Sequence, residues 1–198
     1  MAQRTQAWLE EAIVTITEVG GTDYDYQTLT ETVDIDQGDR DIEAITVLSG
    51  GRITKFTPED VTTVTLECYA LEAGTTSDNN KGFFGMFWDE QSLGSNSELQ
   101  ISATRSRTKY RMVILWTDQA NTTTAPAQIV NSYALRWIGA EGYITSVKPS
   151  FTDGILKFTV TFKVPPYDED GASNIKVESL AGSGTLSALS SYTSTTKF

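Results

Sequence analysis

The acidic segment 34–43, DIDQGDRDIE, is the part of this sequence that comes closest to a chemical motif. Its carboxylates recur every two or three residues, a spacing of the kind that calcium-binding loops use. An EF-hand loop, however, needs oxygen ligands at its first, third and fifth positions and glycine at its sixth. Counted from Asp34, Gly38 is fifth and Asp39 is sixth, so the pattern fails. We interpret the segment as a solvated acidic loop without a metal ion.

Two other groups of carboxylates could in principle supply the acid and base of a glycosidase. They are Asp89 with Glu90, and the run Asp168, Glu169 and Asp170. Glycoside hydrolysis needs two carboxylates about 5 to 9.5 Å apart on either side of a sugar. Sequence neighbours on a turn do not provide that arrangement, so we interpret both groups as solvated loops.

Nucleophilic and metal-assisted catalysis lack their usual residues. The chain has no histidine, which removes the commonest general base and a common zinc ligand. Its single cysteine, Cys68, has the same strand parity as Val64 and Leu66, which predicts a small buried core residue. P-loop, GxSxG and CxxC motifs are absent. The sequence therefore predicts no enzyme, no cofactor and no metal site.

The charge balance restricts the partners. With 15 Lys and Arg against 26 Asp and Glu, the 198-residue chain has a formal net charge of −11. An acidic surface repels phosphate backbones, which argues against ordinary nucleic-acid binding and suits either a surface that DNA passes without sticking or solubility alone. No apolar run is long enough to span a membrane, and the N-terminus lacks the apolar core of a signal peptide. We expect one domain, made in a cytoplasm.

Strand-like alternation runs through most of the chain and predicts its fold. Residues 155–164, which follow an Asp-Gly turn, alternate between apolar side chains such as Phe158 and polar ones such as Lys157 and Lys163. A short helix is expected over 82–91, and no β-α-β alternation occurs. We therefore expect a mainly β protein, an antiparallel β-sandwich or barrel with one short helix. The expected strands are 12–17, 24–35, two within 42–56, 61–71, 109–117, 127–138, 143–151 and 155–164.

Three segments lie outside the regular core of this pattern. Residues 1–9 look like a short amphipathic arm, and residues 34–60, with their glycine turns, predict a long projecting segment. The C-terminal extension 165–198 ends in a stretch, 180–198, that is low in charge and rich in Ser, Thr, Gly and Ala. Such a composition cannot alone bury enough apolar surface to offset its ordering entropy. We expect neighbouring subunits to hold it; the alternative is packing on its own domain.

The order of these parts resembles the tail-tube (major tail) proteins of long-tailed phages and tailed archaeal viruses. In that family a first hairpin, a long stacking segment, a return strand and one helix precede paired C-terminal strands. The corresponding residues here are 12–35, 34–60, 61–71, 81–91 and 109–164. The chain departs from the family in its long tail after Pro166 and in its short, glycine-containing helix.

The resemblance implies a structural virion protein and not an enzyme. Six subunits of the family form a ring whose inner strands join into a continuous β-barrel, and the rings stack into a tail tube that viral double-stranded DNA transits without specific binding. The implied location is the tail of the virion, and the implied partners include the terminator, tape-measure and baseplate proteins. The segment 34–60 would make the contacts between rings, with these candidate residues: Asp34, Asp36, Asp39, Arg40, Asp41, Arg52 and Lys55.

The inward face of such a tube should not bind phosphate. We expect it to be acidic or neutral, with Thr, Ser, Asp and Glu outnumbering Lys and Arg. Lys157 and Lys163 are the difficult residues, because they share the polar face of the final strand. They must pair with carboxylates, or that face must point outward.

A competing interpretation comes from another class of protein. A β-sandwich binding module or a capsid-decoration module would share this composition and these strands. The state of assembly separates the two interpretations, because a binding module stays small in solution whereas a tube subunit forms rings or tubes.

Overall fold

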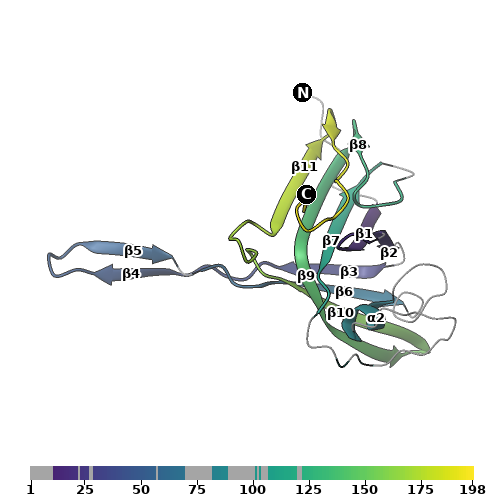
Figure 1. Ribbon diagram of the computed structural model, residues 1–198, viewed down its shortest axis with the longest axis horizontal. Coiled ribbons are helices and arrows are strands. Elements are labelled where there is room, and N and C mark those ends of the chain that lie inside the picture. Colours follow the sequence, from purple (N-terminus) through teal and green to yellow (C-terminus); the bar gives the residue numbers. More distant parts are fainter. Residues whose placement is uncertain are drawn as a thin grey trace.

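Antiparallel strands and one short helix make up the part of the chain that the structure describes (Figure 1). The computed structural model describes residues 11–21, 23–26, 29–56, 58–69, 82–88, 101, 103, 107–119 and 122–198. For these residues the prediction of a mainly β, antiparallel chain with one short helix is confirmed. The expected arm 1–9 and the Asp89–Glu90 pair lie outside them. The elements are β1 Glu11–Glu18, β2 Asp23–Tyr26, β3 Leu29–Asp36, β4 Ile42–Thr46, β5 Arg52–Phe56, β6 Thr62–Tyr69, α2 Phe83–Trp88, β7 Tyr110–Thr117, β8 Ile129–Val130, β9 Tyr133–Thr152, β10 Ile155–Val164, β11 Ile175–Ala181 and β12 Thr185–Leu186.

Most strands belong to one hydrogen-bonded path, in the order β2-β1-β7-β9-β10-β6-β3, with β11 also paired to β9. The 20-residue strand β9 joins two halves, because residues 134–142 pair with β7 and residues 143–152 pair with β10. We call the half with β1, β2, β7, β11 and the start of β9 sheet A, and the half with β3, β6, β10 and the end of β9 sheet B. Among the described strands, β2 and β3 at the two ends of the path do not pair with each other, so no closed barrel forms.

Two glycines of β9 lie near the junction of the sheets, where no side chain fits. A Cβ added to Gly139 would lie 2.6 Å from the Trp137 ring, and one added to Gly142 would lie 2.5 Å from the Phe162 ring. Contacts this short are not tolerated in a close-packed interior, so both positions require glycine.

The two sheets and α2 share one apolar core. Sheet A contributes residues such as Ile114, sheet B contributes Leu66 and Val160, and α2 contributes Phe83. The Phe83 ring stacks on Tyr26 of β2 with the ring centroids 4.5 Å apart. The packing of α2 onto the sheets thus follows from its apolar side chains.

A second apolar cluster lies on the opposite face of sheet A, and the end of the chain covers it. Leu189 and Phe198 pack on this cluster, and Tyr192 is buried. We call residues 187–198 the C-terminal strap. The expectation that neighbouring subunits hold this stretch is wrong, because it packs on its own domain. The buried members of the cluster are Ile13, Val113, Leu115, Ala125, Ile129, Ala134, Ile138 and Leu186.

Several sequence predictions of single elements can now be compared with the structure. The turn at Asp153 and Gly154 is confirmed, with φ angles of 54° and 77°, and Cys68 is buried as expected. The expected strand 24–35 is in fact two strands in different sheets, β2 and β3. Likewise, the expected strands 127–138 and 143–151 are not separate, since β9 runs without a break from Tyr133 to Thr152. Alternating patterns do not reveal where a long strand leaves one sheet for another.

Candidate functional site

Strands β4 and β5 form a separate two-stranded sheet that extends far from the rest of the molecule (Figure 1). We call residues 42–56 the projecting hairpin. Every residue of its two strands is exposed. A two-stranded hairpin without further support is at best marginally stable in water. The projecting hairpin therefore has no core of its own.

Large apolar side chains occupy both faces of the projecting hairpin. Ile42 pairs with Phe56 and Ile45 pairs with Ile53 across the two strands. Because successive residues of a strand point to opposite faces, the two pairs lie on opposite faces. The exposed fractions are 63% and 56% for the first pair, and 47% and 58% for the second. Leu48 in the turn is also exposed, so apolar surface continues to the tip.

The predicted contact residues are spread along this projection and do not form one cluster. Asp34 and Asp36 lie on β3 opposite Thr65 and Thr63 of β6. Asp39, Arg40 and Asp41 lie in the connection to β4, and Arg52 and Lys55 lie on β5 opposite Thr46 and Glu43.

Specific contacts shape the base of the projection. The Asp36 carboxylate accepts a hydrogen bond of 3.0 Å from the Gly38 amide, and Gly38 has a φ of +69°. The Arg40 guanidinium lies 3.3 Å from a Glu59 carboxylate oxygen and 5.7 Å from the centroid of the Phe56 ring. Exposed ion pairs contribute little stability. Sequence reasoning missed Glu59 and all of the apolar residues of the hairpin, because it considered only the charged side chains there.

The face of sheet B that points away from the core is polar. Alternate residues of β6 and β10 place hydroxyl groups there, while their neighbours are buried. Lys157 Nζ lies 3.8 Å from Glu67 Oε2, whereas no ion pair of Lys163 is found among the described residues. Three carboxylates and three ammonium groups leave this face without net formal charge. Its polar residues include Asp34, Asp36, Thr63, Thr65, Glu67, Ser146, Lys148, Ser150, Thr152, Lys157, Thr159, Thr161 and Lys163, and the exposed Ile155 lies at its edge.

Two buried arginines anchor the C-terminal strap on sheet A. Arg136 of β9 donates to the Ser187 carbonyl at 2.7 Å and to a Glu178 carboxylate oxygen at 2.9 Å. Arg111 of β7 donates to the Ser190 carbonyl at 2.8 Å and lies 5.4 Å from the centroid of the Tyr192 ring. Both arginine side chains are 1% exposed, and burial lowers the pKa of Arg111. The strap has little regular structure, so these side chains replace a ladder of backbone hydrogen bonds.

A second set of charges fixes the end of the strap. Lys197 Nζ forms ion pairs with Asp168 and, at 3.3 Å, with Glu141. The hydrogen bond from Lys197 lowers the pKa of the Asp168 carboxyl. The Asp168 carboxylate also accepts the amides of Asp170 and Ala172. The interpretation of 168–170 as a solvated loop therefore fails for Asp168, whose side chain is only 10% exposed.

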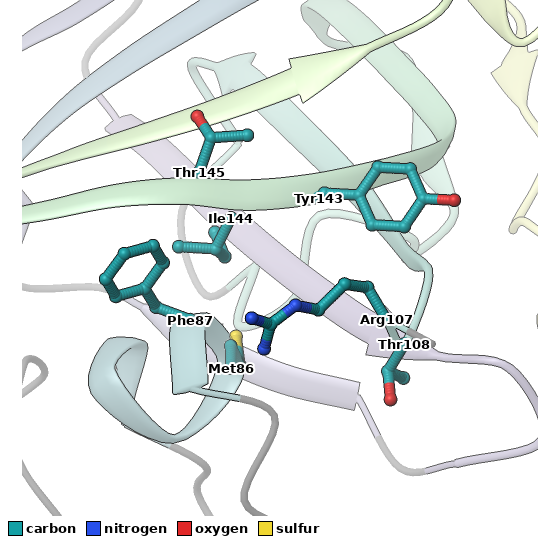
Figure 2. A pocket seen from close by; sticks show the side chains of 7 residues that line it. All are labelled: Met86, Phe87, Arg107, Thr108, Tyr143, Ile144 and Thr145. Carbon is teal, nitrogen blue, oxygen red and sulfur yellow. The ribbon is translucent and has the colours of Figure 1, made fainter. Parts of the chain in front are cut away.

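A cavity of about 510 Å³ lies between α2 and β9. Figure 2 shows Arg107 reaching across it toward Met86, with Phe87 and Ile144 on its apolar side. Its other lining residues are Thr108, Tyr143 and Thr145. Among the described residues that line it, none is a carboxylate that could act as a general base.

No group of three or more His, Cys, Asp or Glu side chains in the described part of the chain is placed to hold a metal ion. No helix described by the structure is long and apolar enough to cross a membrane.

Comparison with known proteins finds similar structures but no matching sequence family. No protein-family model matches the sequence, and a search among curated proteins finds no match. A chain in the cryo-EM structure of the anti-feeding prophage (AFP) baseplate, 6-fold symmetrised, is similar with a TM-score of 0.52 and 9% identity over 88% of this chain and 96% of that one. A chain of the extracellular contractile injection system PVC, from its sheath-tube complex in the extended state, is similar with a TM-score of 0.50 and 15% identity over 90% and 95%.

The chain shares its fold with components of contractile injection systems. At sequence identities of 9% and 15%, the similarity shows a shared fold and does not show a shared activity or assembly. The resemblance stated from the sequence is thus supported only at the level of the fold.

Proposed function

We propose that this protein is a structural subunit of a virion tail, which assembles as stacked six-membered rings into a tube for the passage of viral double-stranded DNA. The observation that carries the proposal is the projecting hairpin, whose strands are wholly exposed although they carry four large apolar residues. Contiguous exposed apolar surface marks an interaction site. The similar chains belong to a 6-fold symmetrised baseplate and to a sheath-tube complex, which fits a tubular, six-fold assembly.

Lateral association in this proposal uses the two free edges of sheet B. Among the described strands, β3 pairs only with β6, and residues 143–152 of β9 pair only with β10. An unpaired edge is a template for another strand, and closure into a ring removes such edges. Pairing β3 of one copy with the end of β9 in the next is a heterologous contact, which produces a closed ring when the rotation allows. The four strands of each sheet B then join into the inner barrel.

The polar face of sheet B lines the lumen in this arrangement. Its hydroxyl groups and balanced charges offer a passing phosphate backbone no net attraction. Lys157 is partnered by Glu67, while Lys163 and Lys148 are offset by the acidic Asp34 and Asp36 on the same face. The wall of the lumen therefore binds DNA weakly, and the passage of DNA requires no catalytic residue.

In this proposal the projecting segment 34–60 makes the axial contacts between stacked rings. The residues at or near these contacts are Asp34, Asp36, Asp39, Arg40, Asp41, Arg52 and Lys55. Terminator, tape-measure and baseplate proteins are the further partners that a tail tube requires.

The proposal is tested by the state of assembly of the purified full-length chain. We expect particles of six times the 21.7 kDa chain mass, and negative-stain images with six-fold rings and tubes. Deletion of residues 45–55 should leave folded subunits and rings that do not stack, because none of these residues is buried in the subunit. A chain that remains monomeric at every concentration would favour the β-sandwich binding or capsid-decoration module instead.

A further inference from the structure

We infer that the projecting hairpin inserts as a wedge between two adjacent copies in the next ring, with one apolar face against each copy. This inference rests on the proposed ring assembly and specifies the partner of the hairpin. It also names the receiving surface, which is the tip of the β9–β10 hairpin, residues 148–157.

The arrangement of apolar side chains on the hairpin requires two partners. The pair Ile42 and Phe56 lies on one face, and the pair Ile45 and Ile53 lies on the other. A hairpin that lay flat on a single surface would bury one pair and leave the other in water. Because burial of apolar surface is the main favourable term in association, a position that covers both pairs is preferred.

The receiving tip lies at the opposite end of sheet B from the projecting hairpin. Strand β6 leaves the projection at Thr62, which is paired with Val164, and ends at Tyr69, which is paired with Lys157. The β9–β10 turn is therefore at the far end of the same strands, as Figure 1 shows. A contact between opposite ends of identical subunits is heterologous and repeats without limit along a stack.

The tip has the chemistry that the hairpin needs. Phe151 and Leu156 are paired across its strands and exposed, and Ile155 is exposed on the opposite face. The tip thus resembles the hairpin in carrying apolar residues on both faces. In a ring, hairpins from one layer and tips from the next can alternate around the axis, so that each hairpin touches two tips and each tip touches two hairpins.

Charge acts at the base of the projection and not along the hairpin. Six of the seven carboxylates of residues 34–60 lie in the flanking segments 34–41 and 58–60, whereas the hairpin itself has one carboxylate and two cationic side chains. Residues 148–157 contain Lys148 and Lys157 and the single carboxylate of Asp153, so the tip is basic. Complementary charge between the acidic base and the basic tip orients the approach of two stacked rings, while the contact of the hairpin with the tip rests on apolar side chains.

Face-specific substitutions separate a wedge from a flat contact. One double variant, Ile42→Ser with Phe56→Ser, alters the first face, and another, Ile45→Ser with Ile53→Ser, alters the second. Val177→Ser, at an exposed position of β11, is the control. We expect each double variant to form rings normally. Its rings should stack into tubes only at a protein concentration at least about tenfold higher than the unsubstituted protein needs, whereas the control stacks normally. Normal stacking by either double variant would overturn the wedge.

Cross-linking tests the identity of the partner. Chains with Ile53→Cys and Phe56→Cys are mixed with chains that carry Phe151→Cys and Ile155→Cys, and tubes are oxidised. The native Cys68 is buried and does not compete. We expect products of three or more chains, because each hairpin touches two tips and each tip touches two hairpins. Two-chain products alone would show docking on a single copy, and tubes without any hairpin-to-tip product would show another receiving surface. Absence of rings in the unsubstituted protein would instead contradict the proposed function, so the two failures are distinct.

Discussion

The projecting hairpin and the C-terminal strap solve the problem of ordering a peripheral segment in opposite ways. The hairpin has regular strands and a complete register, yet all of its strand residues are exposed. The strap has little regular structure, yet Tyr192 within it is 1% exposed and its carbonyls bind Arg111 and Arg136. Regular backbone hydrogen bonds and burial are therefore independent in this molecule. The strap packs on its own chain, whereas in our proposal the apolar side chains of the hairpin are covered by another copy.

The largest effect is expected from removal of a buried cation under the strap. Arg136→Ala removes the Arg136 donor from the Glu178 carboxylate, which keeps only Lys176, and from the carbonyls of Ser187 and Ala127. Breaking a buried ion pair in this way costs about 3 kcal/mol of unfolding free energy. Urea denaturation measures the loss. Arg52→Ala on the exposed hairpin is the control and should change stability by less than about 0.5 kcal/mol.

A somewhat smaller loss should follow at the aromatic anchor of the strap. Tyr192→Ala removes a buried ring and should cost about 2 to 3 kcal/mol, since the end of the chain can partly relax. No hydrogen-bond partner of the buried Tyr192 hydroxyl is found among the described residues. Tyr192→Phe should therefore be neutral or stabilising in thermal denaturation. A large loss in the Phe variant would show that the hydroxyl has a partner after all.

Acid should loosen the end of the strap before it unfolds the sheets. The pKa of Asp168 is lowered by the hydrogen bond from Lys197, so its stabilising effect is present above its ordinary value of 3.8 and is lost as the pH falls below about 4. Proteolysis of the C-terminus at pH 5 and pH 3 measures this. Asp168→Asn should make the strap sensitive at both values. A strap equally protected at both values in the unsubstituted chain would exclude this role for the Lys197 ion pair.

The smallest effect on subunit stability is expected in the hairpin. Ile53→Ser should change the unfolding free energy of dilute subunits by less than about 0.5 kcal/mol, because Ile53 buries little within its own chain. A loss above about 1 kcal/mol would mean that the hairpin packs on its own subunit in solution.

Sequence patterns predicted the buried face correctly in strands that have one apolar and one polar face. They did not predict the surroundings of strands that are apolar on both faces. In β10 the alternation of Phe158, Val160 and Phe162 with polar residues predicted the buried side correctly. In β7, Val113 and Leu115 face the second apolar cluster while Met112 and Ile114 face the main core, so the strand is apolar on both faces. That run already implied a cover on the second face, which the strap supplies.

The candidate site was predictable in outline. Its length and glycine turns indicated a projecting segment, but propensity cannot tell whether Ile45 or Ile53 is exposed, because exposure depends on tertiary contacts. The buried roles of Arg111 and Arg136 were also hidden, since their partners are strap carbonyls that lie 79 and 51 residues away in sequence.

Hydrogen exchange of the hairpin and the strap, before and after assembly, tests the account most directly. In dilute subunits the amides of 42–56 should exchange rapidly, because two strands alone protect poorly, while the strap amide of Leu189, which donates to the Pro126 carbonyl, should exchange slowly. Assembly should protect the hairpin strongly and leave the strap unchanged. A hairpin that is already protected in the dilute subunit, or that remains unprotected in the assembled particle, would contradict the claim that another copy completes it.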